Sequence, residues 1–86
     1  MAELILLALD ESSTLALISR AFRAVGYKTA IAHNEAGVMK VMQESHPALV
    51  LVESSFHQEK SIGLIEKLLL EYPTLPIAFL ATQNAP

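Results

Sequence analysis

The chain has 86 residues, a formal net charge of −3 and no cysteine, so it has room for one small domain and excludes disulfides, thiol nucleophiles and thiolate metal sites. Its basic residues are scattered apart from Arg20 and Arg23, which excludes the basic stripe of a nucleic-acid-binding surface. The longest apolar runs, 4–9 and 77–81, are shorter than the roughly 18 residues of a membrane-spanning helix. Because Glu3 stands where a secretory signal carries a base, we expect a cytoplasmic protein with no nucleic-acid or membrane partner.

The amino-terminal part of the chain predicts a buried strand followed by a helix. Leu4–Leu9 is wholly apolar, which is typical of a strand covered on both faces of a parallel sheet. Apolar residues then recur at helical spacing and predict a helix over about 14–25. Ser12 or Ser13 offers a cap for this helix, and Gly26 supplies its left-handed stop.

The next segments predict an edge strand and a second helix. Residues 27–32 are mixed and less apolar, as expected for a strand at the edge of a sheet. Asn34 is a favourable helix cap, and the apolar residues that follow it recur at helical spacing as far as about Ser45. Pro47 cannot continue that helix.

The remaining segments complete an alternating pattern of strands and helices. Ala48–Glu53 is a second wholly apolar strand that ends in a carboxylate, and a polar loop follows over 54–60. A third helix is predicted to stop before Pro73, and residues 76–81 predict a fourth strand. The sum is βαβαβαβ, which predicts an α/β fold with a parallel, doubly wound sheet.

Glu53 is the main candidate for function. In open α/β sheets the ligand crevice lies beyond the carboxyl ends of the strands, and Glu53 is the last residue of its predicted strand. Two interpretations of this residue remain open. Glu53 either belongs to a ligand pocket at this edge of the sheet, or it is a solvated acid at the end of a strand.

The order and spacing of these segments resemble the receiver domain of two-component response regulators. The resemblance rests on Ile5–Glu11, on a helix ending in Gly26–Tyr27, on Ala48–Glu53, and on the segments 63–68 and 76–82. It covers the whole chain but only about the first two-thirds of such a domain. It implies a flavodoxin-like (CheY-like), three-layer αβα fold that lacks the fifth strand here, with residues 1–86 as the amino-terminal part of a larger domain or protein.

The resemblance also implies the chemistry of the site. Receivers accept a phosphoryl group from a histidine kinase on an aspartate at the end of the third strand, and Mg²⁺ is held by that residue and by acids after the first strand. Here Glu53 stands at the acceptor position, and Asp10 and Glu11 complete an acidic pocket in which Asp10 and Glu53 are the metal ligands, if only weakly. The first acid of the family pattern is replaced by Leu9.

The position of the family's switch hydroxyl falls on Ala81, with Thr82 one place later, and the strand that carries the family's lysine is absent. These departures favour a pseudo-receiver that is not an enzyme and works by contact with a histidine kinase or an output domain, with Glu53 either silent or a permanent phosphoryl mimic. One alternative is a working phosphoacceptor that uses Glu53 and Mg²⁺. Another is a structural fragment without activity of its own.

The high apolar content has a further implication for assembly. Hydrophobic residues make up 52% of the chain, which fits either a sheet covered on both faces or a surface covered by more protein. The fourth strand would become an unprotected edge in the receiver strand order, and such an edge is a template for pairing with another chain. Unless further chain completes the domain, we therefore expect a homodimer or higher assembly through residues 77–81 and the uncovered sheet face beside the first helix. Parts of Leu4, Leu6, Ala78 or their neighbours would be exposed on that face.

Overall fold

The computed structural model describes residues 3–9, 12–53 and 61–80. Strands and helices alternate along the described chain, as the sequence predicts, and their bounds are as follows: β1 (Leu4–Ala8), α1 (Ser12–Ala24), β2 (Lys28–Ala32), α2 (Glu35–Glu44), β3 (Leu49–Glu53), α3 (Ser61–Glu71) and β4 (Ile77–Leu80). Most bounds lie within one residue of the predicted ones. The exception is α1, which begins at Ser12 and therefore includes both of the residues expected to cap it.

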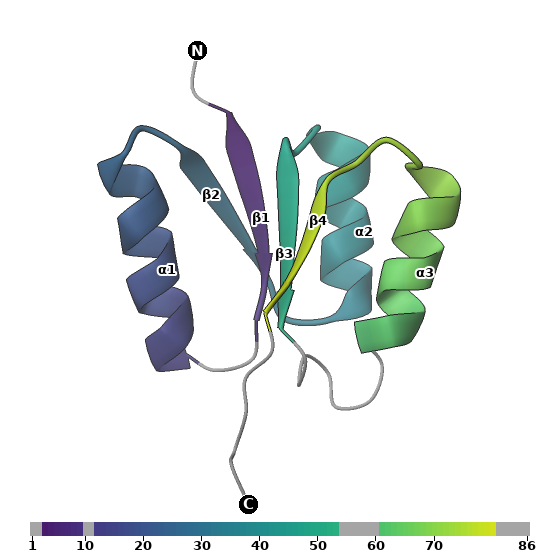
Figure 1. Ribbon diagram of the computed structural model, residues 1–86, viewed down its shortest axis with the longest axis horizontal. Coiled ribbons are helices and arrows are strands. Elements are labelled where there is room, and N and C mark those ends of the chain that lie inside the picture. Colours follow the sequence, from purple (N-terminus) through teal and green to yellow (C-terminus); the bar gives the residue numbers. More distant parts are fainter. Residues whose placement is uncertain (1–2, 10–11, 54–60, 81–86) are drawn as a thin grey trace, which may run out of the picture.

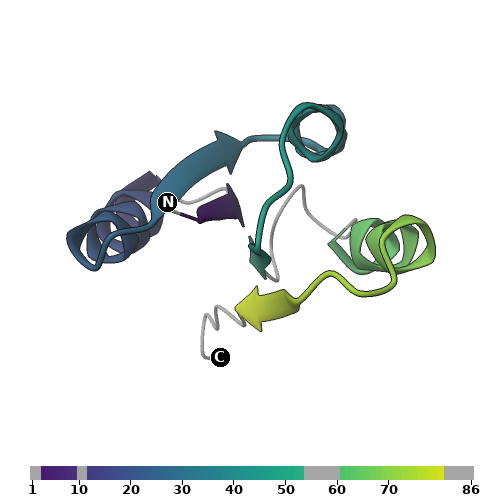
Figure 2. The ribbon, with the colours of Figure 1, turned by 90° about the horizontal axis from the view of Figure 1, so that it is seen from above.

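The strands form one parallel sheet in the order β2-β1-β3-β4. This order confirms the flavodoxin-like arrangement, with β2 and β4 at the edges. Figure 1 shows α1 on one side of the sheet and α2 and α3 on the other. In the view from above, α1 lies beside β2 and β1, and no described helix lies against β3 and β4 on that face (Figure 2).

The face under α2 and α3 carries the larger apolar cluster of the described residues. Side chains on alternate positions of the strands pack there against one face of each helix. The buried members are Leu6, Ala8, Ala32, Val38, Met42, Val50, Val52, Leu64 and Leu68. Removing this much apolar surface from water is the main stabilising contribution to the fold.

The face under α1 carries a smaller cluster of Ile5, Leu7, Leu9 and Leu15. Half-buried Leu49, Leu51 and Leu80 pack against its edge. The expectation that Leu4 and Leu6 lie on this face is wrong: Leu6 is fully buried under α2 and α3, and Leu4 shares its side by strand alternation. Ala78 does lie on the α1 face, since it pairs with Leu51.

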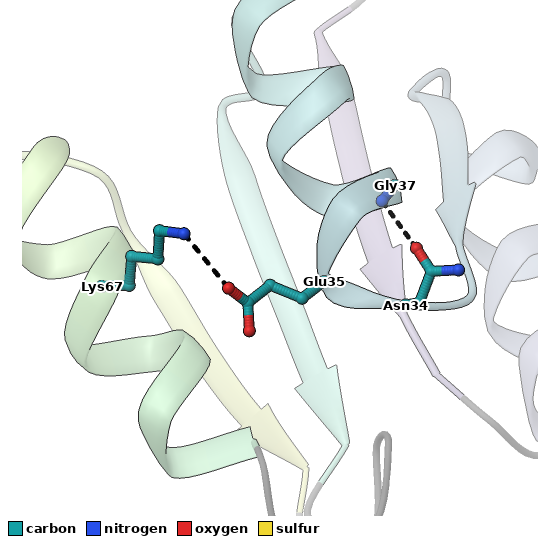
Figure 3. Close-up of polar contacts among 4 residues, drawn as sticks. All are labelled: Asn34, Glu35, Gly37 and Lys67. Carbon is teal, nitrogen blue, oxygen red and sulfur yellow. Dashed lines mark hydrogen bonds and ion pairs between the residues drawn. The ribbon is translucent and has the colours of Figure 1, made fainter.

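Local signals explain where α2 begins and where α1 ends. Asn34 lies just before α2 in an extended conformation, and its side-chain oxygen accepts a hydrogen bond of 2.7 Å from the backbone N–H of Gly37 (Figure 3). This bond satisfies one of the free donors of the first turn. Gly26 follows α1 with φ of 100°, a conformation that a side chain disfavours.

None of the described helices is long and apolar enough to cross a membrane.

Candidate functional site

Glu53 ends β3 at the carboxyl edge of the sheet, where the sequence predicted the site. In the parallel register it lies opposite Leu80 of β4. On the other side of β3, Ala8 of β1 pairs with Val52, so Leu9 continues the chain toward the same edge. Strand alternation places the Glu53 side chain on the α1 face of the sheet, together with Leu51.

Burial decides between the two interpretations of Glu53. Only 1% of the residue is exposed, so the interpretation as a solvated acid at a strand end is wrong. A buried carboxylate is costly unless other groups compensate for the lost water. Glu53 has an interaction partner in the structure. A side chain in this position acts on its surroundings from inside the fold, because its oxygens do not reach the surface.

The rest of the predicted site cannot be assembled from the described residues. Asp10, Glu11, Ala81 and Thr82 all lie outside the described ranges. Leu9, at the position of the missing family acid, is fully buried in the α1-side cluster. As far as the structure describes it, the carboxyl edge holds the buried Glu53 beside the apolar Leu9 and Leu80, with the exposed polar residues His33 and Asn34 after β2.

Of the two expected magnesium ligands, the structure places Glu53, whereas Asp10 lies outside the described residues. Mg²⁺ prefers six oxygen ligands in an octahedral arrangement, with one or two carboxylates among them. Within 3–9, 12–53 and 61–80, no group of three or more histidine, cysteine or acidic side chains is placed to hold a metal. The side chain of Leu9 supplies only carbon atoms at this edge, and a hard cation gains nothing from them.

The structure also reveals two polar contacts that sequence reasoning missed. The hydroxyl groups of Ser19 in α1 and Thr29 in β2 form a hydrogen bond of 3.0 Å beneath the helix. Lys67 Nζ of α3 lies 3.2 Å from Glu35 Oε2 of α2, and this ion pair links the two helices on the same sheet face (Figure 3). Residues 32 positions apart give no local signal of such a pair.

A shallow pocket of about 440 Å³ lies beside this ion pair, between α2 and α3. It is lined by Glu35, Ala36, Met39, Lys40, Gln43 and Lys67. Its lining residues belong to α2 and α3, which cover the opposite face of the sheet from the Glu53 side chain.

Comparison with known proteins defines the class of this fold. No family model matches the chain, and no curated protein matches its sequence. Solved structures match it closely in shape, with sequence identities of about one-fifth. They include receiver domains of response regulators, so the chain has the fold of a receiver domain, in the flavodoxin-like form that the sequence predicted.

Three of the similar structures illustrate the match. A response regulator from Thermotoga maritima superposes with a TM-score of 0.85 at 21% identity, over 99% of this chain and 71% of that one. The non-phosphorylated HemR receiver domain from Leptospira biflexa gives 0.83 at 18% identity, over 98% and 68%. NtrX from Brucella abortus, in complex with ADP, gives 0.87 at 20% identity, over 99% of this chain but only 19% of its own.

These values establish the receiver fold and its extent. The chain covers about 70% of the receiver-sized structures and under one-fifth of NtrX. It has the receiver strand order as far as β4.

Proposed function

We propose that this chain is a pseudo-receiver, a regulatory module of signal transduction that acts by protein contact with little or no phosphorylation. The observation that carries the proposal is the carboxyl edge of a receiver-type sheet on which a buried glutamate and a buried leucine, Glu53 and Leu9, stand at two positions of the phosphorylation site. The receiver fold supports a role in signalling. The altered site argues against the usual phosphoryl chemistry.

The physical case against phosphorylation rests on access and charge. An attacking carboxylate must lie in line with the phosphoryl donor, and a cation must neutralise the charge that develops on the transferring group. Glu53 is almost completely buried, and Leu9 removes one of the oxygen ligands that would hold the cation. Binding of Mg²⁺ at Asp10 and Glu53 is therefore proposed to be weak, and no catalytic role is assigned.

The proposed partners are a histidine kinase or an output domain, with residues 1–86 acting as the amino-terminal part of a larger protein. A buried Glu53 does not touch such a partner directly. Its negative charge would instead mimic a phosphoryl group by holding the neighbouring strand ends in one arrangement. A change in this charge would then alter the packing of the carboxyl edge, and the altered packing would change how the partner binds.

We also propose that two copies of the chain pair through β4, unless further chain completes the domain and covers this edge. Its edge carries unpaired backbone groups on one side, since β3 is its only neighbour among the described strands. The strand IAFL contains no charge and no proline, and Phe79 is 47% exposed. Edge strands of this kind add readily to a second strand. A two-fold pairing of β4 would join two sheets into one.

The test of the phosphorylation proposal is incubation with an acyl phosphate donor and Mg²⁺, followed by intact mass measurement. We expect no mass gain. A gain of one phosphoryl group that disappears in Glu53→Gln would establish the alternative, a working phosphoacceptor. The second alternative, a structural fragment, requires that wild type and Glu53→Gln both fail to bind a kinase or an output domain.

The test of β4 pairing is sedimentation of wild type and Phe79→Lys at micromolar concentration. We expect wild type to sediment as a dimer and Phe79→Lys as a monomer, because a lysine places charge on the pairing strand. Thr74→Lys adds the same charge at an exposed position before β4 and serves as the control. A wild-type mass of 9.4 kDa that Phe79→Lys leaves unchanged would refute the pairing.

A further inference from the structure

The outer surface of α1 carries an exposed apolar stripe with a positive charge. Leu17, Ala21 and Ala24 are exposed and recur at the spacing of one helix face, and Leu17 is 67% exposed. Arg20 lies on the same face between Leu17 and Ala24. The helix contains no acidic residue at all, so this surface is positive.

The outer surface of α3 is the negative counterpart. Ile62, Leu69 and Leu70 are exposed on one face of the helix, and Leu70 is 85% exposed. Glu66 lies on that face between them. A shallow pocket of about 490 Å³ is lined by Glu66, Leu69 and Leu70. Lys67 does not cancel the charge of Glu66, because Lys67 is paired with Glu35 of α2.

The two surfaces are complementary in size as well as in charge. Suppose that α1 of one copy lies beside α3 of another and runs in the same direction. When the small residues Ala21 and Ala24 face the larger Leu69 and Leu70, Arg20 lies opposite Glu66. Small side chains on one helix let large ones on the other approach closely. The charge pair at the centre of the contact then selects the partner surface.

One molecule cannot make this contact with itself. In both views α1 and α3 lie at opposite ends of the molecule, on opposite faces of the sheet (Figures 1 and 2). We propose that α1 of one copy docks on α3 of a second copy through Leu17, Arg20, Ala21 and Ala24 on one side and Ile62, Glu66, Leu69 and Leu70 on the other. This contact is separate from the pairing of β4 and does not depend on the proposed signalling role.

The geometry determines the kind of assembly. The contact joins two different surfaces, so it is head-to-tail, and such contacts form either rings or open chains. Figure 1 shows α1 and α3 running in the same direction, with their buried faces toward the sheet between them. A copy added by this contact is therefore displaced with little rotation, which gives an open chain. The proposed contact uses four residues on each side, far fewer than the roughly 20–30 per side of stable interfaces, so the association is weak and reversible.

The experiment is a charge exchange measured by sedimentation from micromolar to millimolar concentration. It is made in the Phe79→Lys background, which removes the proposed β4 pairing. We expect the average mass to rise continuously with concentration, without a plateau at two chains, and to fall with added salt. Arg20→Glu and Glu66→Arg should each lower the association constant by about tenfold or more, because attraction becomes repulsion.

Sedimentation of a mixture of Arg20→Glu and Glu66→Arg is the decisive measurement. In the mixture, α1 of each variant can dock on an α3 of opposite charge that belongs to the other variant. We therefore expect association to return to the level of the parent. Lys40→Glu and Glu44→Arg make the same changes in net charge at exposed positions of α2, and we expect them to leave association unchanged. Far-ultraviolet circular dichroism confirms that each variant is folded.

Three results would overturn the proposal. One is a mass that stays at a single chain throughout the concentration range in the parent. Another is a parent whose association is insensitive to both charge variants. The last is a mixture that remains as dissociated as its two components.

Discussion

Ser19 of α1 and Thr29 of β2 are joined by a hydrogen bond between hydroxyl oxygens that lie 3.0 Å apart. Ser19 is buried beneath its helix, so the bond fixes α1 against the edge of the sheet from inside. Removing one hydroxyl leaves the other without its partner at a position that water reaches poorly.

We expect Ser19→Ala and Thr29→Val each to lower the free energy of unfolding by about 1–2 kcal/mol. The double variant should cost less than the sum of the two single costs, since it leaves no unpaired hydroxyl. Urea denaturation of the four proteins gives the coupling energy. Thr74→Val, at an exposed turn position, is the control that should change little. Strict additivity would mean that the two hydroxyls do not interact in solution.

Two leucines on α3 offer a matched test of the core. Leu68 is fully buried, whereas Leu70 is 85% exposed. We expect Leu68→Ala to cost about 2–5 kcal/mol, because it removes buried methyl groups and leaves a cavity, and Leu70→Ala to stay within about 0.5 kcal/mol of wild type. Chemical denaturation measures both. Similar losses in the two variants would contradict the orientation of α3.

The cap of α2 should be measurable by substitution. Asn34→Ala removes the acceptor for the Gly37 N–H, and we expect it to lower stability by about 1 kcal/mol. Asn34→Ser keeps a cap oxygen and should recover most of that loss. The midpoint of thermal unfolding gives the comparison. If alanine and serine behaved alike, the side-chain bond would not contribute to the start of α2.

Glu53 can be tested through its charge and its volume. We expect Glu53→Gln to weaken binding to the partner, because it removes the charge while keeping the size of the side chain. Glu53→Asp keeps the charge and should weaken binding less, although it shortens a fully buried side chain. Binding is measured by titration calorimetry against a histidine kinase or output domain. Equal affinity of wild type and Glu53→Gln would remove the support for a phosphoryl mimic.

The elements of the fold were predictable because their signals are local. A wholly apolar run gives a buried strand, Asn34 gives a helix start, and Gly26 gives a helix stop, all without knowledge of distant residues. The strand order followed from the resemblance to receivers. The sheet face of each side chain was harder. A run without polar residues has no visible alternation, which is why Leu6 was assigned to the wrong face.

The candidate site was less predictable than the fold. The sequence placed Glu53 at a strand end, but its burial depends on the surrounding segments, which no local pattern encodes. The replacement of a family acid by Leu9 was visible, whereas its packing into the α1-side cluster required the structure. The ion pair between Glu35 and Lys67 depends on the spacing of two helices. Such contacts arise only once the chain has folded.

The unequal division of the core between the two sheet faces has a consequence for how the molecule opens. The α1-side cluster is the smaller one among the described residues, and α1 lies mainly against β1 and β2. Elements that bury less apolar surface detach at a lower free energy than global unfolding requires. Backbone amides of α1 should therefore exchange with deuterated solvent faster than those of β1 and β3, through a partial opening in which the rest of the sheet stays intact.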